Sequence, residues 1–262
     1  MFCSKCGATL NVDDKFCSKC GKAASIVAEQ SVIANSAAVT PLTSFRNPTK
    51  LTTWLKYFLY TSITIDAIAL FSYVLQYQLL LDYKLDAYSL EAWVAAAAST
   101  DKRQQIIMVL QFGVTLITVM LFAMWIYRAN FNSRALGSQN MKFTPGWSVG
   151  YYFIPFLNLW YPYHAMKEIW KNSKNPTAWE NEKRGAILPW WWLFFLVNNL
   201  LSNVLFRASM GANDINSIIS VTKITIIFDM MNILSGLIAI VLVGKVYEMQ
   251  IIKFVELENH NN

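Results

Sequence analysis

Four long apolar stretches constrain this chain more than any other feature of its 262 residues. They cover about 54–81, 104–127, 186–206 and 223–244. Each holds the ~20 residues that a helix needs to cross ~30 Å of hydrocarbon. One such stretch is compatible with a buried helix of a soluble protein, but four in one chain indicate a membrane protein. We therefore predict an all-α integral membrane protein, with a four-transmembrane-helix bundle over 51–258.

The composition and the placement of positive charge agree with this prediction. Only 15% of the residues are charged, against about 25% in soluble domains. Seventeen of the 22 Lys and Arg residues lie before the first stretch, between the second and third, or after the fourth, with those at the adjoining edges. Because short cytoplasmic segments are rich in Lys and Arg, we expect a multi-pass membrane protein with both termini in the cytoplasm. The net charge of +6 then reflects insertion and contact with the lipid bilayer, and nucleic acid is not an expected partner.

All four cysteines lie in the first 20 residues, as two Cys-x2-Cys pairs separated by ten residues. Zn²⁺ takes four tetrahedral ligands, and each Cys-x2-Cys turn places two thiolates side by side. We predict a zinc ribbon over 1–22 that holds one structural zinc ion through Cys3, Cys6, Cys17 and Cys20. Two disulfides are the alternative, which we do not expect because cytoplasmic thiols stay reduced. Residues 23–50, with little charge and two prolines, predict a flexible linker.

The segment 143–174, between the second and third stretches, is dense in aromatic residues. Its part 147–163 carries no charge and is interrupted by Pro155 and Pro162, so it is too short and too broken to span a membrane. Whether it is re-entrant or lies at the interface is left open. After Pro162, apolar residues and lysines occupy different helical faces, which predicts a basic amphipathic helix on the membrane surface.

Two carboxylates lie inside the apolar stretches. Each costs ~2.5–3.5 kcal/mol at the centre of a membrane helix, so each should face the bundle interior with a polar partner. Gln111, Thr115 and Thr118 form a polar stripe on the second stretch that offers such partners. Two interpretations stand: a proton- or ion-responsive path, and interhelical hydrogen bonds that guide assembly, which we favour. The candidate residues are Asp66, Asn198, Asn199, Asp229 and Asn232.

Three stretches of the middle segment form a distinctive pattern: 125–130, which reads Trp-Ile-Tyr-Arg-Ala-Asn, 134–137, which reads Arg-Ala-Leu-Gly, and 144–170, which contains Pro-Gly-Trp and Ile-Pro-Phe-Leu-Asn-Leu. This pattern resembles the bacterial membrane family called domain of unknown function 4328, which implies a bacterial inner membrane. The resemblance covers about 51–248 and is most specific in these stretches. Residues 2–22 resemble the short bacterial zinc-ribbon family. Together the two resemblances imply a membrane domain of unestablished activity and a structural zinc. The motif residues are Tyr127, Arg128, Asn132, Pro145, Gly146, Trp147, Pro155, Asn158, Leu159, Pro162, Glu168 and Trp170.

The functional hypotheses start from the catalytic motifs that do not occur in this sequence. The two histidines, His164 and His260, have no nucleophile beside them in sequence, and no metalloprotease, phosphate-loop or nucleophile-elbow motif occurs. We therefore expect a non-enzymatic protein whose cytosolic ribbon docks a protein partner, as an adaptor, sensor or assembly factor. The alternative is a small-solute or proton-linked transporter or channel that uses Asp66 and Asp229 and forms a homo-oligomer. An enzyme acting on lipid and a ribbon that binds nucleic acid are weaker hypotheses.

Overall fold

The computed structural model describes residues 9, 19, 20, 44–85 and 89–261. The chain divides into two compact units, 1–39 and 40–262. Only three residues of the first unit are described, so the predicted ligands Cys3, Cys6 and Cys17 and most of the predicted linker lie outside the described residues. All helices of the described structure lie in the second unit.

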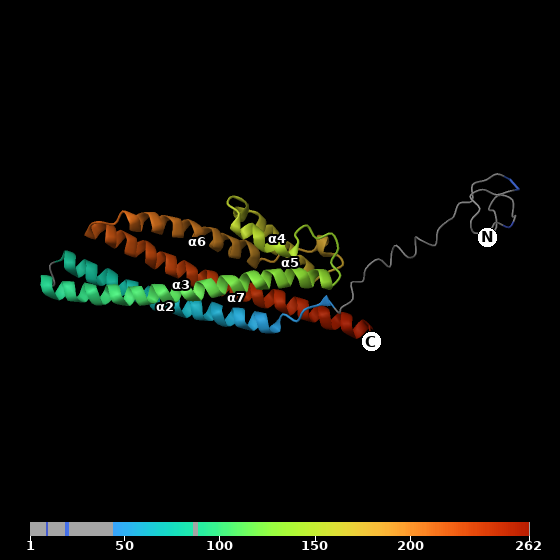
Figure 1. Cartoon of the computed structure of the whole chain (residues 1–262), viewed down its shortest axis with the longest axis horizontal. Coiled ribbons are helices and arrows are strands. Elements are labelled where there is room, and N and C mark those ends of the chain that lie inside the picture. Colours follow the sequence, from blue (N-terminus) through green and yellow to red (C-terminus); the bar gives the residue numbers. More distant parts are fainter. Residues whose placement is uncertain (1–8, 10–18, 21–43, 86–88, 262) are drawn as a thin grey trace. The chain divides into compact units, whose positions relative to one another are not determined.

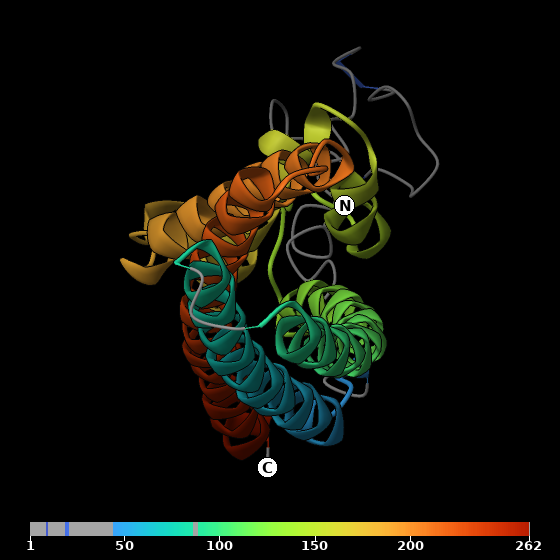
Figure 2. The ribbon, with the colours of Figure 1, turned by 90° about the vertical axis from the view of Figure 1, so that its left-hand side faces the viewer.

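Four long helices form this unit: α2 (Thr49–Lys84), α3 (Leu90–Ala135), α6 (Ile187–Met210) and α7 (Ile215–Asn261) (Figure 1). All four have the length and composition to cross a membrane. The helices α2 and α3 form an antiparallel hairpin, α7 packs along α2, and α6 packs along α7 rather than on the hairpin (Figure 2). The predicted fold class, an all-α membrane protein with four spanning helices, is confirmed.

The helices extend well beyond the apolar stretches that they contain. The stretch 104–127 lies inside α3, which begins at Leu90 and has 46 residues. At ~1.5 Å per residue this helix is ~69 Å long, more than twice the hydrocarbon thickness. The Ser89 side chain caps the helix by accepting the Ala92 N–H at 3.4 Å, and the alanine run 95–98 favours helix. Much of the region between the first two apolar stretches is therefore helix rather than loop.

Short elements occupy the region between α3 and α6. They are α4 (Pro145–Gly150), the 3-10 helices η3 (Tyr151–Phe153) and η4 (Leu157–Leu159), α5 (Tyr161–Lys174) and the 3-10 helix η5 (Trp179–Asn181). None is long enough to span a membrane. The predicted amphipathic helix corresponds to α5, but its apolar face is buried against the protein through Met166, Ile169 and Trp170. Lipid therefore does not cover that face, because α3 and α7 already do.

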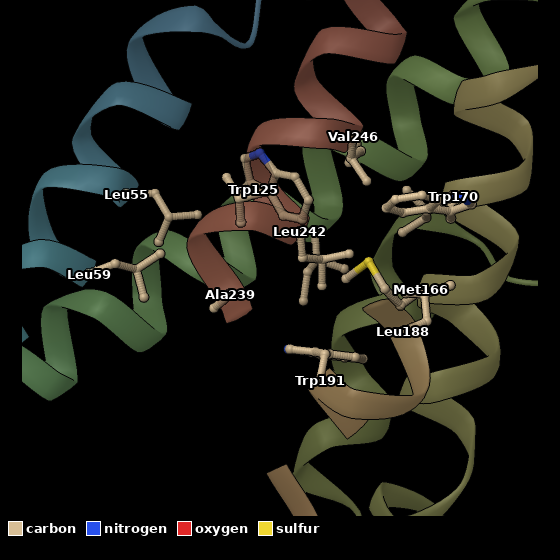
Figure 3. Packing of buried hydrophobic residues seen from close by; sticks show 14 residues of the cluster. Leu55, Leu59, Trp125, Met166, Trp170, Leu188, Trp191, Ala239, Leu242 and Val246 are labelled. Carbon is tan, nitrogen blue, oxygen red and sulfur yellow. The ribbon is translucent and has the colours of Figure 1, made fainter. Parts of the chain in front are cut away.

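The largest buried core lies where α5 meets the four long helices. One fully buried side chain comes from each of five helices, and burying a large aliphatic or aromatic group stabilises the fold by ~1.5–3 kcal/mol. These side chains are Leu55, Trp125, Met166, Leu188 and Leu242 (Figure 3). Along the rest of the bundle, large apolar side chains such as Val109 and Phe112 are exposed. That distribution suits helices surrounded by lipid.

Candidate functional site

A ladder of polar side chains joins α2 to α3 along the bundle. Four hydrogen bonds make it up: Ser62 Oγ with Thr118 Oγ1 at 3.3 Å, Gln111 Nε2 to Asp66 Oδ1 at 3.0 Å, Arg103 Nε to Ser72 Oγ at 2.7 Å, and Gln104 Nε2 to Gln76 Oε1 at 3.0 Å. Sequence reasoning named Asp66 and its partner Gln111. It missed the bonds at Ser72 and Gln76, although these positions lie 6 and 10 residues after Asp66, within one sector of the same helix.

A second carboxylate faces the same space from α7. Asp229 is 2% exposed, and its Oδ2 has no hydrogen-bond partner among the described residues. Asp66, Gln111, Asp229 and Asn232 all line one cavity of about 600 Å³. The fold thus brings two carboxyl groups from helices far apart in sequence to one cavity, where one is hydrogen-bonded and the other retains an unpaired oxygen.

Two other cavities adjoin this one along the bundle. Towards the α5 end it shares Leu59, Thr118 and Val119 with a cavity of about 380 Å³ that reaches α4, η3 and α6. Towards the other end it shares four lining residues, Tyr73 and Thr225 among them, with a cavity of about 360 Å³ near the α6–α7 connection. The three cavities are therefore neighbours in a row, each separated from the next by shared side chains.

The asparagines of α6 do not join the carboxylates. Asn199 donates to the Phe195 carbonyl at 2.7 Å, within its own helix, and lines the second cavity. Asn203 likewise donates to the Asn199 carbonyl at 2.8 Å. Asn198 has a buried Oδ1 with no hydrogen-bond partner in the part of the chain that the structure describes. Of the five intramembrane candidates, Asp66, Asp229 and Asn232 therefore share a cavity, whereas Asn198 and Asn199 lie elsewhere.

The motif residues at the α5 end build a rigid junction. Asn130 Nδ2 and Arg134 Nη2 donate to the Phe143 carbonyl at 3.0 and 2.8 Å. From α5, the Glu168 carboxylate accepts the N–H groups of Lys142 and Phe143 at 3.0 and 3.1 Å. Burial raises the pKa of the Glu168 carboxyl, although these two N–H groups and the nearby Arg134 oppose the rise. The backbone at 142–143 is therefore held from α3 and α5 at once.

The other predicted motif residues differ in their contacts and in their burial. The Asn132 side-chain amide donates to the Arg46 carbonyl at 2.9 Å and accepts the Arg46 backbone N–H at 3.1 Å. The Arg128 guanidinium donates to the Asn47 carbonyl at 3.3 Å. Asn158 lines the second cavity. Two of these residues are buried, Pro162 and Trp170, and three are exposed, Tyr127, Trp147 and Leu159. The helix α4 begins with Pro145 and Gly146. Pro155 precedes Phe156, whose φ is positive.

Sequence reasoning missed Gln250, which is 1% exposed on α7. Its Nε2 lies within hydrogen-bond distance of the Ala129 carbonyl, Ser133 Oγ and Ser173 Oγ, at 2.8, 3.3 and 3.0 Å. A single amide thereby links α3, α5 and α7. The available signal was a glutamine within a strongly apolar helix, which needs a buried partner.

Most of the predicted zinc ligands lie outside the described residues. Cys20 alone among them is described, and it is half-buried. Within residues 44–85 and 89–261, with residues 9, 19 and 20, no group of three metal-binding side chains is found. Four thiols in two Cys-x2-Cys pairs nevertheless fit a tetrahedral zinc site, in which Cys3, Cys6, Cys17 and Cys20 would hold the ion.

Comparison with known proteins identifies two families. The model of the family described as Domain of unknown function (DUF4328) matches residues 88–248, and the model of a zinc-ribbon domain matches residues 2–23. Neither description names an enzymatic activity. No curated protein and no solved structure matches the chain.

Proposed function

Because the chain belongs to the family Domain of unknown function (DUF4328), a name that assigns no activity, we propose a function from the cavity itself. The membrane bundle binds a small cationic solute at Asp66 and Asp229 and exchanges it for a proton. The single observation that carries this proposal is the pair of carboxyl groups lining one intramembrane cavity, one of them with an unpaired buried oxygen.

The charge balance supports a cationic ligand. An ionised carboxylate without a partner is strongly unfavourable in hydrocarbon, so it is protonated or paired with a cation. Gln111 donates to Asp66, but the described residues offer no hydrogen bond to Asp229 Oδ2. When a cation binds, the carboxylic acid loses its proton and the carboxylate pairs with the cation, which leaves the charge of the site unchanged. Proton release and cation uptake are thereby linked.

The walls and the size of the cavity favour an organic cation over a bare metal ion. Tyr73, Phe112 and Phe228 line the cavity beside the carboxyl groups, and aromatic faces attract cations. A space of about 600 Å³ is large for a single metal ion but suits an organic molecule. The adjoining cavities lie towards both ends of the bundle, which supports movement of a solute along it.

Uptake by proteoliposomes tests the proposal. The purified full chain is reconstituted, a proton gradient with an acidic lumen is imposed, and tetraphenylphosphonium serves as the organic cation. Gradient-dependent uptake is expected for the native chain and for Asp101→Asn, because Asp101 is an exposed carboxylate of α3 that does not line the three cavities. Asp66→Asn and Asp229→Asn should abolish uptake while leaving the protein monodisperse. Absence of native uptake, or full uptake by both variants, would overturn the proposal.

A second function rests on the N-terminal match. The zinc-ribbon family model over 2–23 supports a ribbon domain held by zinc, and four lysines make that segment basic. We propose that this ribbon docks a protein partner, as an adaptor, sensor or assembly factor. Crosslinking in membranes followed by pull-down should recover a specific partner with the native chain and lose it with Cys17→Ser, with zinc content measured in parallel. Recovery of the same partners by both chains would contradict docking through the ribbon.

The topology and assembly belong to the same proposal. We place the ribbon (1–22), the linker (23–50), the α5 end of the bundle and the C-terminus of the membrane domain (51–258) on the cytoplasmic side of an inner membrane. The distribution of Lys and Arg supports this orientation. The long exposed apolar faces of α3 support association with a second copy as well as with lipid.

A further inference from the structure

A further pocket, separate from the three cavities described above, lies between α5 and the segments on either side of it. It has a volume of about 490 Å³. Lysines from two elements converge on it: Lys142 comes from the segment before α4, and Lys167 and Lys171 come from α5. Phe143 and Trp179 provide aromatic walls. Neither the proposed cation site nor the zinc ribbon includes this pocket.

Hydrogen bonds connect the walls of the pocket. The carboxylate of the buried Glu168 accepts the backbone N–H groups of Lys142 and Phe143, which positions that backbone. The Trp179 indole donates to the Gln139 carbonyl at 2.9 Å and is held in place as a wall. Lys171 Nζ donates to the Glu180 carbonyl at 2.9 Å. The Lys142 backbone and the Lys171 side chain are therefore attached to a defined framework.

The charge of the pocket is incompletely neutralised. The ion pairs within 44–85 and 89–261 join Lys174 to Glu182 and Lys253 to Glu256, so they use none of the pocket lysines. Both oxygens of Glu168 already accept backbone N–H groups. Burial, with Lys167 and Lys142 nearby, lowers the pKa of His164. His164 is therefore neutral at pH 7 and adds a hydrogen-bonding group without adding a charge.

The surroundings place this pocket beside the membrane surface. The Trp160 ring is 6.2 Å from the His164 ring, centroid to centroid, and Trp160 is 68% exposed. The neighbouring Phe153 and Phe156 are also strongly exposed. Exposed aromatic residues of this kind lie at the depth of lipid headgroups, where phosphate groups are abundant.

We propose that this pocket is a phosphate-binding site, in which Lys142, Lys167 and Lys171 bind the phosphate of an anionic ligand. An anionic lipid headgroup and a free phosphate compound share this chemistry. Lysine binds phosphate as a point charge, and each basic residue near an anionic lipid surface strengthens binding about fivefold. The aromatic walls beside the lysines favour a lipid, whose glycerol and acyl groups would contact them.

Calorimetric titration of the purified full chain in an uncharged detergent tests the site. Short-chain phosphatidylglycerol and inorganic phosphate are the two probes, and short-chain phosphatidylcholine is the zwitterionic control. The native chain should bind phosphatidylglycerol more tightly than phosphatidylcholine. Combined Lys142→Gln and Lys167→Gln changes should weaken that binding at least tenfold. Lys174→Gln, on the same helix but outside the pocket, should leave the affinity unchanged.

A variant that is expected to bind phosphate more tightly controls for a loss of binding that is caused by misfolding. Glu180 lines the pocket and its residue is exposed, so Glu180→Gln should tighten phosphate binding severalfold by removing a like charge. Inorganic phosphate binding that responds to the lysine variants in the same way also supports the site and identifies a soluble ligand. Binding of neither probe, or binding that ignores the lysine and Glu180 variants, would overturn the proposal.

Discussion

Gln111 on α3 donates a hydrogen bond of 3.0 Å to Asp66 on α2, inside the part of the bundle expected to lie in the membrane. This bond satisfies one oxygen of Asp66, and the Gln111 side chain also interacts with Asp229 in the same cavity. Among the described residues, Asp229 Oδ2 has no hydrogen-bond partner. The proposed cation exchange depends on this oxygen, because a bound cation or proton would supply the partner that the described residues do not.

Replacement of Gln111 by Leu should destabilise the bundle. The change removes the donor to Asp66 and the only bond of the ladder that involves a carboxylate. Side-chain hydrogen bonds between membrane helices contribute ~0.6–1.7 kcal/mol, so the free energy of unfolding should fall by about that amount. Thermal or denaturant unfolding in detergent measures it. Gln105→Leu, at an exposed position of α3, is the control and should change nothing.

Replacement of Gly185 by Ala should disturb the core at the α5 end. A Cβ atom at this position would clash with Cε2 of the buried Trp170 ring. Overpacking of this kind costs ~1–3 kcal/mol, so the unfolding midpoint should fall. Gly146→Ala is the matched control, because nothing lies within 4 Å of a Cβ atom there. Equal midpoints for the two variants would contradict the packing described for Trp170.

Replacement of Gln250 by Leu should loosen the junction of three helices. The change removes the donor to the Ala129 carbonyl and Ser173 Oγ in a site with no access to solvent. Leaving buried polar groups unpaired costs ~1–3 kcal/mol. Amide hydrogen exchange in α5 should accelerate, since α5 is held to α7 there. The exposed Gln78→Leu change should leave exchange in α5 as it is in the native chain.

The first turn of α7 should depend on pH through Asp214. This carboxylate accepts the N–H groups of Asn216 and Ser217 at 2.8 and 3.1 Å. The hydrogen bonds from Ser217, followed by that from Asn216, hold the pKa of Asp214 below its usual value. The stabilisation is therefore complete above the ordinary pKa and is lost as the pH falls through the lowered value. The protection of the amides of residues 216 and 217, taken as the intrinsic exchange rate at each pH divided by the measured rate, should fall on acidification in the native chain. Asp214→Asn, which keeps a capping side chain, should remove that pH dependence.

Hydrophobic length alone predicted the class of the fold, because four apolar stretches of about 20 residues have few other uses. It could not predict the ends of the helices: α3 begins at Leu90 through a cap at Ser89 and an alanine run, which carry no membrane signal. The polar pattern found Asp66 with Gln111 but placed no partner beside Asp229. The hydrogen bonds of Gln250 and Glu168 depend on which helices pack together, and one sequence without tertiary contacts does not specify that.

Proton release on cation binding directly tests whether Asp66 and Asp229 exchange a proton for a bound cation. Tetraphenylphosphonium is titrated into the purified full chain in buffers of different ionisation enthalpy, so that calorimetry reports the number of protons released per cation bound. We expect proton release for the native chain and for Asp101→Asn. A variant that combines Asp66→Asn and Asp229→Asn should release none. Cation binding without proton release in the native chain, or unchanged release in the combined variant, would contradict the assignment of these two carboxyl groups.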